Sequence, residues 1–529
     1  MLRFIYLVGC LMSMSHGWSS LKMTTALPKP PLPRIIQGGM GIRISNWKLA
    51  REVSRRGELG VISGTAMDTI LVRSLQSGDG DMLGALRHFP DQDMVKRVLD
   101  QYYIPGGKHA NKPFKNLPMW TLIPSQVLLE VTVLANFAEV WLAKHNDDGT
   151  PTGGLVGINL LTKVQLPTLP SLYGAMLADV DYVIMGAGIP MAIPGFLDRL
   201  AQGEACSMSL DVEGKLPVGM AATFTFSPEE FWANAGKPAL CTPLLRPSFL
   251  PIVSSVVLAQ SMLKRATGAG PTRGIQGFVI ELPTAGGHNA PPRGSMQLND
   301  RGEPVYGPKD QVNLQQFQQA TQGLPFWLAG SCAGKFHQVL AMGGQGIQVG
   351  TAFALANESG MTDHVRQATL QHLMNDDSMK VFTDPQASPT GFPFKVLQIP
   401  ETLSETTVYE QRPRVCNLGY LRTPFVTKEG SINFRCAAEP VDAYIKKGGT
   451  LKATEGRKCL CNALCADAGY PQVLPGGTNE PGLVTMGDDV TFCRRFVKQD
   501  EGKLGYSAND VMDYLLKEFE TGARDSACL

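Results

Sequence analysis

The sequence predicts an α/β protein, a (β/α)8 TIM barrel with insertions and a C-terminal cysteine-containing extension. Short apolar runs recur between residues 35 and 350, and most of them end in glycine or a small polar residue. The runs lack polar–apolar alternation, which is typical of parallel strands buried on both faces. Helical patterns fill the gaps, and eight such strand–helix units favour a closed barrel. The predicted strands are 35–40, 59–64, 155–161, 180–185, 250–254, 277–282, 325–329 and 346–350.

The chain divides into three predicted parts. Residues 1–27 form a targeting or disordered segment, residues 28–390 form the barrel, and residues 391–529 form the extension. Three segments within the barrel are longer than ordinary connecting loops. These predicted insertions are at about 65–125, 201–243 and 289–308.

The N-terminus has the residue order of a targeting signal. Arg3 precedes an apolar run over residues 4–14, and small residues follow, as in a secretory signal. We expect the secretory route or an organelle such as a plastid; the alternative is an unprocessed chain in the cytoplasm. No other segment offers about 18 uninterrupted apolar residues, so we expect no stable membrane span after processing.

Composition excludes one class of partner. The 529 residues are 43% apolar and 18% charged, with a formal net charge of +1, which is ordinary for a globular enzyme. A chain without a basic excess lacks the charge to hold a polyphosphate backbone, so nucleic acid is excluded. We expect a small-molecule substrate, and the oligomeric state stays open.

Active sites of (β/α)8 barrels lie at the carboxyl ends of the strands, and two early strands end in residues suited to a planar ligand. The first ends in Gln37-Gly38-Gly39-Met40-Gly41, where glycine lets the backbone approach a flat ring closely. Asn159 interrupts the apolar run 155–161. Its amide offers a donor and an acceptor to a ligand; the alternative is an asparagine satisfied within the core.

A histidine follows the sixth predicted strand, in the motif Thr284-Ala285-Gly286-Gly287-His288. The paired glycines allow a tight turn that presents His288 at the barrel mouth. Imidazole can donate, accept or carry a proton near neutral pH. His288 is therefore the candidate catalytic residue, with a purely structural histidine as the alternative.

The last two strand ends have the composition of a phosphate site. Ala329-Gly330-Ser331-Cys332 follows the seventh strand, and Gln348-Val349-Gly350-Thr351 follows the eighth. In barrels of this kind these two loops bind phosphate through backbone N–H groups. The serine and threonine hydroxyls would add donors.

Together these segments resemble a known family. IIQGGMG, VGINLL, TAGGHNAPPRG and LAGSCAGKFHQVLAMGGQGIQVGTAFALANES look like the nitronate monooxygenases, formerly called 2-nitropropane dioxygenases, and the related enoyl reductases. The resemblance covers about residues 33–400. It implies an FMN-binding oxidoreductase with His288 in the active site. By the same resemblance, the residues expected at the cofactor are Gln37, Gly38, Met40, Asn159, Gly286, Gly287, Gly330, Ser331, Gln348, Gly350 and Thr351.

The sequence departs from the family pattern at the seventh strand. The family motif there is Ala-Gly-Gly-Ile, whereas this chain has Ala329-Gly330-Ser331-Cys332. Ser331 can still donate through its backbone N–H, so a phosphate site remains compatible with the change. The insertions and the extension look like a larger subgroup whose substrate the resemblance does not name.

Cysteines crowd the last quarter of the chain. Cys459, Cys461 and Cys465 form a C-x-C-x3-C motif, and Cys416 and Cys436 precede it. This spacing matches neither the common zinc pairing nor the ferredoxin pattern. We expect no metal, and reduced or disulfide-linked thiols in a compact extension; a thiolate metal site is the alternative.

Three functions compete. The first is nitronate monooxygenase-type oxidation of a nitronate or nitroalkane with FMN and O2, in which His288 orients the carbanion or deprotonates its neutral form. The second is NAD(P)H-dependent enoyl reduction on the same FMN, for which the absent GxGxxG fingerprint decides little. The third is a non-catalytic barrel scaffold, which the intact AGGH motif and both phosphate-type loops disfavour.

Overall fold

The computed structural model describes residues 31–266, 274–376 and 379–527. The chain forms two units, Met1–Leu32 and Pro33–Leu529, and the description below concerns the second. The predicted targeting segment lies outside the described residues.

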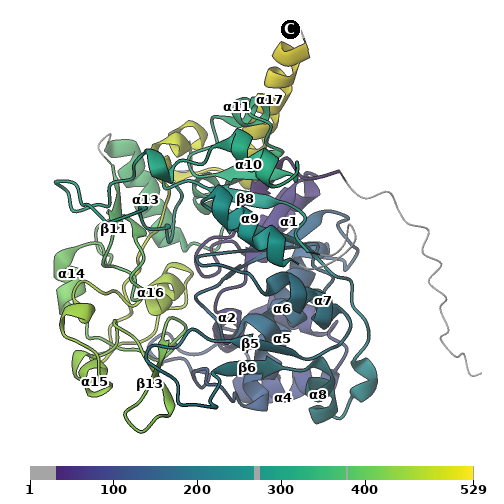
Figure 1. The fold of residues 1–529 in the computed structure, drawn as a ribbon, viewed down its shortest axis with the longest axis vertical. Helices are drawn as coiled ribbons and strands as arrows, with labels where there is room; N and C mark the ends of the chain where they lie inside the picture. Colours follow the sequence, from purple (N-terminus) through teal and green to yellow (C-terminus); the bar gives the residue numbers. More distant parts are fainter. Residues whose placement is uncertain (1–30, 267–273, 377–378, 528–529) are drawn as a thin grey trace, which may run out of the picture. The chain divides into compact units, whose positions relative to one another are not determined.

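Eight parallel strands close a barrel in the order β1-β10-β9-β8-β7-β4-β3-β2, which confirms the predicted (β/α)8 fold (Figure 1). Each predicted run corresponds to one barrel strand, although β1 ends at Gln37 rather than at Met40. The strands are β1 Ile35–Gln37, β2 Leu59–Ser63, β3 Leu155–Leu161, β4 Tyr182–Gly186, β7 Ser248–Val253, β8 Phe278–Glu281, β9 Phe326–Ala329 and β10 Gly346–Val349.

A separate apolar cluster fills the inside of the barrel. It includes Ile36, Val61, Ile184, Val279 and Trp327, all of them buried. Inward-facing residues of this kind pack in layers, so the barrel is a core and not a pore. The polar and glycine residues named above come after these layers along each strand, which leaves room for a ligand only at the carboxyl end.

Helices surround the barrel, and side-chain caps set where several of them begin. Asn46, Ser125 and Ser255 each accept a hydrogen bond from the backbone N–H three residues later, which satisfies one of the free donors at a helix start. The helices up to the last barrel strand are α1 Trp47–Arg55, α2 Met67–Gln76, α3 Gly80–Leu86, α4 Gln92–Tyr102, α5 Gln126–Lys144, α6 Thr168–Leu177, α7 Ile193–Ala201, α8 Pro228–Asn234, α9 Val256–Arg265, α10 Leu314–Ala320 and α11 Phe336–Ala341, with 3-10 turns at Pro238–Leu240 and Pro308–Asp310.

Among the described residues, α5 alone is long and apolar enough to cross a membrane, with a mean hydropathy of 1.4. However, 78% of that stretch is buried within the protein, where α5 packs against α1, α2 and α6. Its apolar composition is that of a core helix, because its faces are covered by protein on nearly every side.

The region predicted as an extension packs directly onto the barrel. One continuous apolar core contains Ile280 of β8 and Phe353, which follows β10, together with Leu460, Val484 and Leu515, and Figure 1 shows α16 on the side of the C-terminal region nearer the barrel. The elements after the last barrel strand are α12 Thr351–Ala354, α13 Asp363–Asn375, β11 Val381–Asp384, β12 Phe394–Leu397, α14 Thr406–Gln411, β13 Thr423–Val426, β14 Ile432–Arg435, α15 Val441–Lys446, α16 Leu460–Asp467, β15 Lys498–Asp500, β16 Lys503–Gly505 and α17 Ala508–Ala527, with 3-10 turns at Lys452–Thr454 and Val490–Phe496.

Two short hairpins join the predicted barrel region to the C-terminal region. β5 Cys206–Ser209 pairs antiparallel with β6 Thr223–Phe226, inside the predicted insertion at 201–243. Glu213, in the connection between them, forms a β-bridge with Phe425 of β13. β11 and β12 pair across residue 390, so backbone hydrogen bonds join the two sides of that predicted boundary.

Candidate functional site

A large cavity lies at the carboxyl ends of the barrel strands. Its lining surrounds about 1450 Å³ of space not filled by protein atoms, which includes open solvent, and the centre of a water-sized sphere can occupy about 190 Å³ of it. Eleven of the twelve residues that the sequence predicts for the site line it. They are Gly38, Met40, Asn159, Gly286, Gly287, His288, Gly330, Ser331, Gln348, Gly350 and Thr351.

Gln37 differs from that prediction, because it does not line the cavity. Its amide nitrogen donates to Gly38 O and to Ser45 Oγ, and its amide oxygen accepts from Val61 N at 3.0 Å. The side chain is fully buried and already bonded on both ends. Gln37 therefore joins β1 to β2, and its role is structural.

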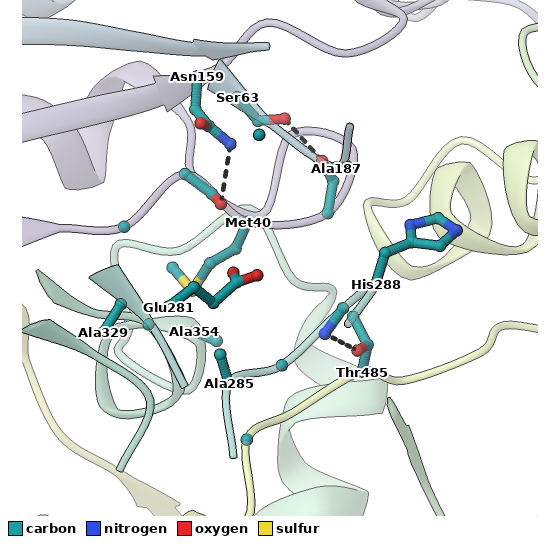
Figure 2. Close-up of a pocket in the computed structure, with 18 of the residues that line it drawn as sticks. Met40, Ser63, Asn159, Ala187, Glu281, Ala285, His288, Ala329, Ala354 and Thr485 are labelled. Atoms are coloured by element: carbon teal, nitrogen blue, oxygen red, sulfur yellow. Dashed lines mark hydrogen bonds between the residues drawn. The ribbon is translucent and has the colours of Figure 1, made fainter. Parts of the chain in front are cut away.

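Four buried polar atoms at the cavity have no hydrogen-bond partner among the described residues. They are Asn159 Oδ1 in β3, Gln348 Oε1 in β10, Ser331 Oγ after β9 and Thr284 Oγ1 after β8. Asn159 makes only a long contact, from Nδ2 to Gly39 O at 3.5 Å (Figure 2). Buried polar groups without partners are costly and rare, so their gathering in one cavity indicates a polar ligand.

The turn after β9 holds an unfavourable backbone conformation. Gly330 has a φ of 100°, and Ser331 follows in the left-handed region with a φ of 51°. A side chain at position 330 would place its Cβ 2.9 Å from Thr284 Oγ1, so glycine is required there. Ser331 thus holds a conformation that glycine adopts more readily, and such strain is often found at ligand sites.

The segment 485–489 of the C-terminal region crosses the cavity mouth. Thr485 Oγ1 accepts from Gly287 N at 2.9 Å, and Asp488 N donates to Thr284 O at 3.0 Å. A Cβ at Gly286 would lie 2.9 Å from the Met486 backbone. The AGGH turn is thus held tightly against a segment about 200 residues away in sequence.

This segment brings an acid to one of the predicted phosphate loops. The Thr351 hydroxyl accepts from Gly487 N at 3.0 Å and is hydrogen-bonded to the Asp489 carboxyl. Burial raises the pKa of Asp489, while Thr351 and the more distant Lys335 act in the opposite direction. The resulting carboxyl favours its protonated form more than an exposed aspartate does.

His288 lines the cavity but is engaged on one nitrogen. Nε2 lies 2.7 Å from Ser388 Oγ, and the ring packs edge-on against Phe394 at 4.8 Å between centroids. Burial, with a smaller effect from the positive charge of Lys163, holds the pKa of His288 well below its ordinary value. The imidazole is therefore neutral near pH 7.

Two further ionisable groups belong to this region, and the sequence analysis did not identify them. Glu281, the last residue of β8, lines the cavity, and burial raises its pKa to about 7. Burial lowers the pKa of Lys163, which follows β3, also to about 7, against the opposing charge of Glu281. Glu281 could have been predicted as a site residue, because it is a charged residue at the end of an otherwise apolar strand. No local sequence pattern indicates a role for Lys163.

The C-terminal region supplies cavity residues that no motif marks. Their side chains come from separate segments that only the fold brings together. They are Phe394, Tyr420, Leu421, Leu460, Cys461, Leu464, Thr485, Met486, Gly487 and Asp489.

All nine cysteines in the described part of the chain carry free thiols. Cys416 and Cys436 are hydrogen-bonded to each other, and this bond lowers the pKa of the Cys416 thiol and raises that of Cys436. Within the same described ranges, no group of three or more His, Cys, Asp or Glu residues is placed to hold a metal ion.

Comparisons with known proteins find structural neighbours. No protein-family model and no curated protein matches the chain. Among solved structures it is similar to FabK from Thermotoga maritima, with 13% identity over 94% of this chain and 95% of that chain and a TM-score of 0.42. It is similar to nitroalkane oxidase from Streptomyces ansochromogenes, with 14% identity over 94% and 97% and a TM-score of 0.43.

A third neighbour is the enoyl reductase domain of MlnA from Bacillus amyloliquefaciens, with 12% identity over 93% of this chain and 95% of that domain and a TM-score of 0.41. Similarity this low carries no argument about function. The fold and the site define a (β/α)8 barrel with a cavity at the carboxyl ends of its strands.

Proposed function

We propose that the protein is an FMN-dependent oxidoreductase that acts on a small molecule, and that its cofactor binds in the cavity at the carboxyl ends of the strands. The observation that carries the proposal is the set of unpartnered buried atoms on Asn159, Gln348, Ser331 and Thr284. Since all four border one cavity, a single ligand with polar edges would satisfy them together. A non-catalytic scaffold would not explain why the protein bears the free-energy cost of burying these polar atoms without partners.

The residues present fit a flavin mononucleotide. Asn159 and Gln348 each offer an amide oxygen and an NH2 group, which match the alternating acceptors and donors of the ring edge. Gly38 leaves space beside Gln348, and Gly350 leaves space beside Met40, whose side chain faces the cavity centre (Figure 2). When bound, the cofactor would accept electrons from the substrate and pass them to O2.

The loops after β9 and β10 would hold the phosphate. Ser331 supplies a free hydroxyl, and backbone N–H groups of these loops are suited to an anion. Asp489 would oppose a phosphate if it were ionised. Burial raises the pKa of Asp489, and its carboxyl is hydrogen-bonded to Thr351, so this bond and the raised pKa both reduce the repulsion.

For the reaction itself, we propose oxidation of a nitronate or a nitroalkane. The support is the family resemblance of the AGGH motif and the strand ends, together with a His288 that borders the cavity and is neutral near pH 7. NAD(P)H-dependent enoyl reduction is the competing reaction in the same cavity, and the experiment below separates the two.

The test begins with the visible spectrum of the purified protein and mass identification of the released cofactor. We expect a yellow protein that releases FMN. Anaerobic mixing with a nitronate should bleach the flavin, and mixing with NADH or NADPH plus an enoyl thioester should not give turnover. A colourless protein or bound FAD contradicts the proposal, and nicotinamide consumption with the thioester identifies the enoyl reductase.

A further inference from the structure

Glu281 places a carboxylate in the centre of the cavity. It ends β8, and its backbone pairs with Ala329 of β9. In Figure 2 the carboxylate projects into the space between Met40 and His288, whereas the His288 ring is directed away from that space. No described residue forms a hydrogen bond or an ion pair with the Glu281 carboxylate, so its oxygens are free to meet a ligand.

Lys163 is the positive charge that acts on Glu281. Its Nζ is buried, has no hydrogen-bond partner, and lies 3.2 Å from the centroid of the Phe392 ring. Burial raises the pKa of Glu281 and lowers that of Lys163, each to about 7, and the charge of either group partly offsets the shift of the other. Both groups can therefore exchange a proton near neutral pH.

Other ionisable groups surround Glu281 from the remaining elements. Tyr306, Arg293 and Asp310 line a smaller cavity on its other side, and burial raises the pKa of Tyr306, with a further contribution from Glu281. His288 and Asp489 border the main cavity. His288 is neutral and bonded to Ser388, and Asp489 is bonded to Thr351, so both are engaged elsewhere.

We propose that Glu281 is the acid–base residue of this cavity and that the positive charge of Lys163 favours its ionised form. The inference rests on the proposed function and names the group that makes a neutral substrate reactive. For a nitroalkane, the C–H bond next to the nitro group breaks, an O–H bond forms on the Glu281 carboxylate, and the electron pair stays on the substrate as the nitronate. Glu281 then returns the proton to water.

The first test compares Glu281→Gln with wild type in anaerobic stopped-flow reduction of the flavin. We expect reduction by a neutral nitroalkane to slow by about 10²–10⁴-fold, and reduction by the preformed nitronate to change little, because its carbon proton is already gone. Glu130→Gln is the matched control. Glu130 is a buried carboxylate on α5 that pairs with Arg97 outside the cavity, and its variant should match wild type with both substrates.

Each outcome decides the inference. Unchanged nitroalkane reduction in Glu281→Gln would overturn it, and equal slowing with both substrates would leave Glu281 as a structural group only. If wild type itself binds no flavin, or if the nitronate fails to reduce it, the proposed function is what fails.

The second test needs no turnover. Infrared spectra of the wild-type protein, taken between about pH 5 and 9, should contain a protonated-carboxyl band that titrates near neutral pH and is missing in Glu281→Gln. Glu139 and Asp467, whose pKa values burial also raises to about 7, should titrate equally in both proteins. An identical titration in the two proteins would overturn the inference even when no substrate is found.

Lys163 is tested through the pH profile. Removing the positive charge that acts on Glu281 favours the protonated form of its carboxyl. In Lys163→Met, the midpoint of the pH profile for nitroalkane reduction should therefore move to higher pH, and nitronate reduction should be unchanged. Lys163→Arg should restore the wild-type midpoint. A Lys163→Met midpoint equal to that of wild type would remove Lys163 from the pair.

Discussion

Single residues at the cavity show where stability is given up for ligand binding. Ser331 adopts left-handed backbone angles with a side chain whose hydroxyl has no protein partner. Left-handed geometry costs an L residue roughly 1–2 kcal/mol relative to glycine, and an unpaired buried hydroxyl adds to that cost. Both costs are explained if the ligand meets this serine.

We expect Ser331→Gly to stabilise the flavin-free protein and to weaken flavin binding. The free energy of unfolding should rise by about 1 kcal/mol, because glycine relieves the backbone strain. Loss of one hydroxyl donor should weaken binding by about 0.5–1.5 kcal/mol. Denaturant unfolding of the apoprotein and flavin titration measure the two effects. Glu401→Gly, at an exposed residue with a φ of 63°, should stabilise without touching flavin affinity.

Gly350 provides a charge test at the β10 end. Its φ of −107° suits any residue, and a Cβ there would contact the Met40 side chain at ordinary distances, 3.4 Å from Sδ and 3.7 Å from Cγ. Gly350→Ala should therefore keep the flavin. Gly350→Asp should weaken binding by about 3 kcal/mol, or roughly 10²-fold, since two charges ~5 Å apart repel by that amount at an effective dielectric of ~20. Wild-type flavin content in a folded Gly350→Asp protein would contradict the phosphate placement.

His288 is predicted to act without exchanging a proton. Its Nε2 is engaged by Ser388, and burial keeps the ring neutral. We expect His288→Ala to retain flavin and to slow reduction by a nitroalkane and by its nitronate to a similar extent, as loss of an orienting group does. A loss confined to the neutral nitroalkane, measured by the same anaerobic stopped-flow comparison, would make His288 the base in place of Glu281.

At the scale of elements, the contact between the AGGH turn and segment 485–489 shapes the cavity mouth. Two backbone N–H groups bond across it, and the glycine at 286 leaves no space for a larger residue. The turn that presents His288 is therefore positioned by the C-terminal region as well as by β8.

Replacing Thr485 by Val should loosen that turn. The change keeps the shape of the side chain but removes the acceptor for Gly287 N, and an unsatisfied donor costs about 1–3 kcal/mol. Thermal unfolding should report the loss, and amide exchange at Gly287 should accelerate. Thr225→Val, at an exposed position of β6, should change stability by no more than about 0.5 kcal/mol. Unchanged exchange at Gly287 would show that the bond does not hold the turn.

For the whole molecule, the barrel and the C-terminal region share one apolar core. Each large apolar side chain taken out of such a core costs about 1.5–3 kcal/mol, while the net stability of a folded protein is only about 5–15 kcal/mol. We expect a fragment comprising residues 33–390 to fail to fold cooperatively, as judged by denaturant unfolding. Deletion of residues 2–32, which form a separate unit, should leave the transition intact. A cooperative transition in the fragment would show that the barrel is independent.

Much of the fold and of the cavity lining was predictable, because the relevant signals are local. Apolar runs without alternation specify parallel strands, and parallel strands in a closed barrel bring their carboxyl ends to one face. Glycine turns and polar residues at those ends, from Gly38 to Thr351, therefore had to lie near one another whatever the exact packing.

What only the tertiary structure decided depends on contacts between distant segments. The sequence places a glutamine at position 37 and a histidine at position 288 near the barrel mouth. Whether each side chain faces a ligand depends on its hydrogen bond within the fold, to Val61 for Gln37 and to Ser388 for His288. The raised pKa of Glu281 comes from burial that the whole fold creates. The closing segment 485–489 carries no motif. Patterns along the chain determined which strands form and where they end, and packing across the chain determined the charge state, the direction and the enclosure of the residues placed there.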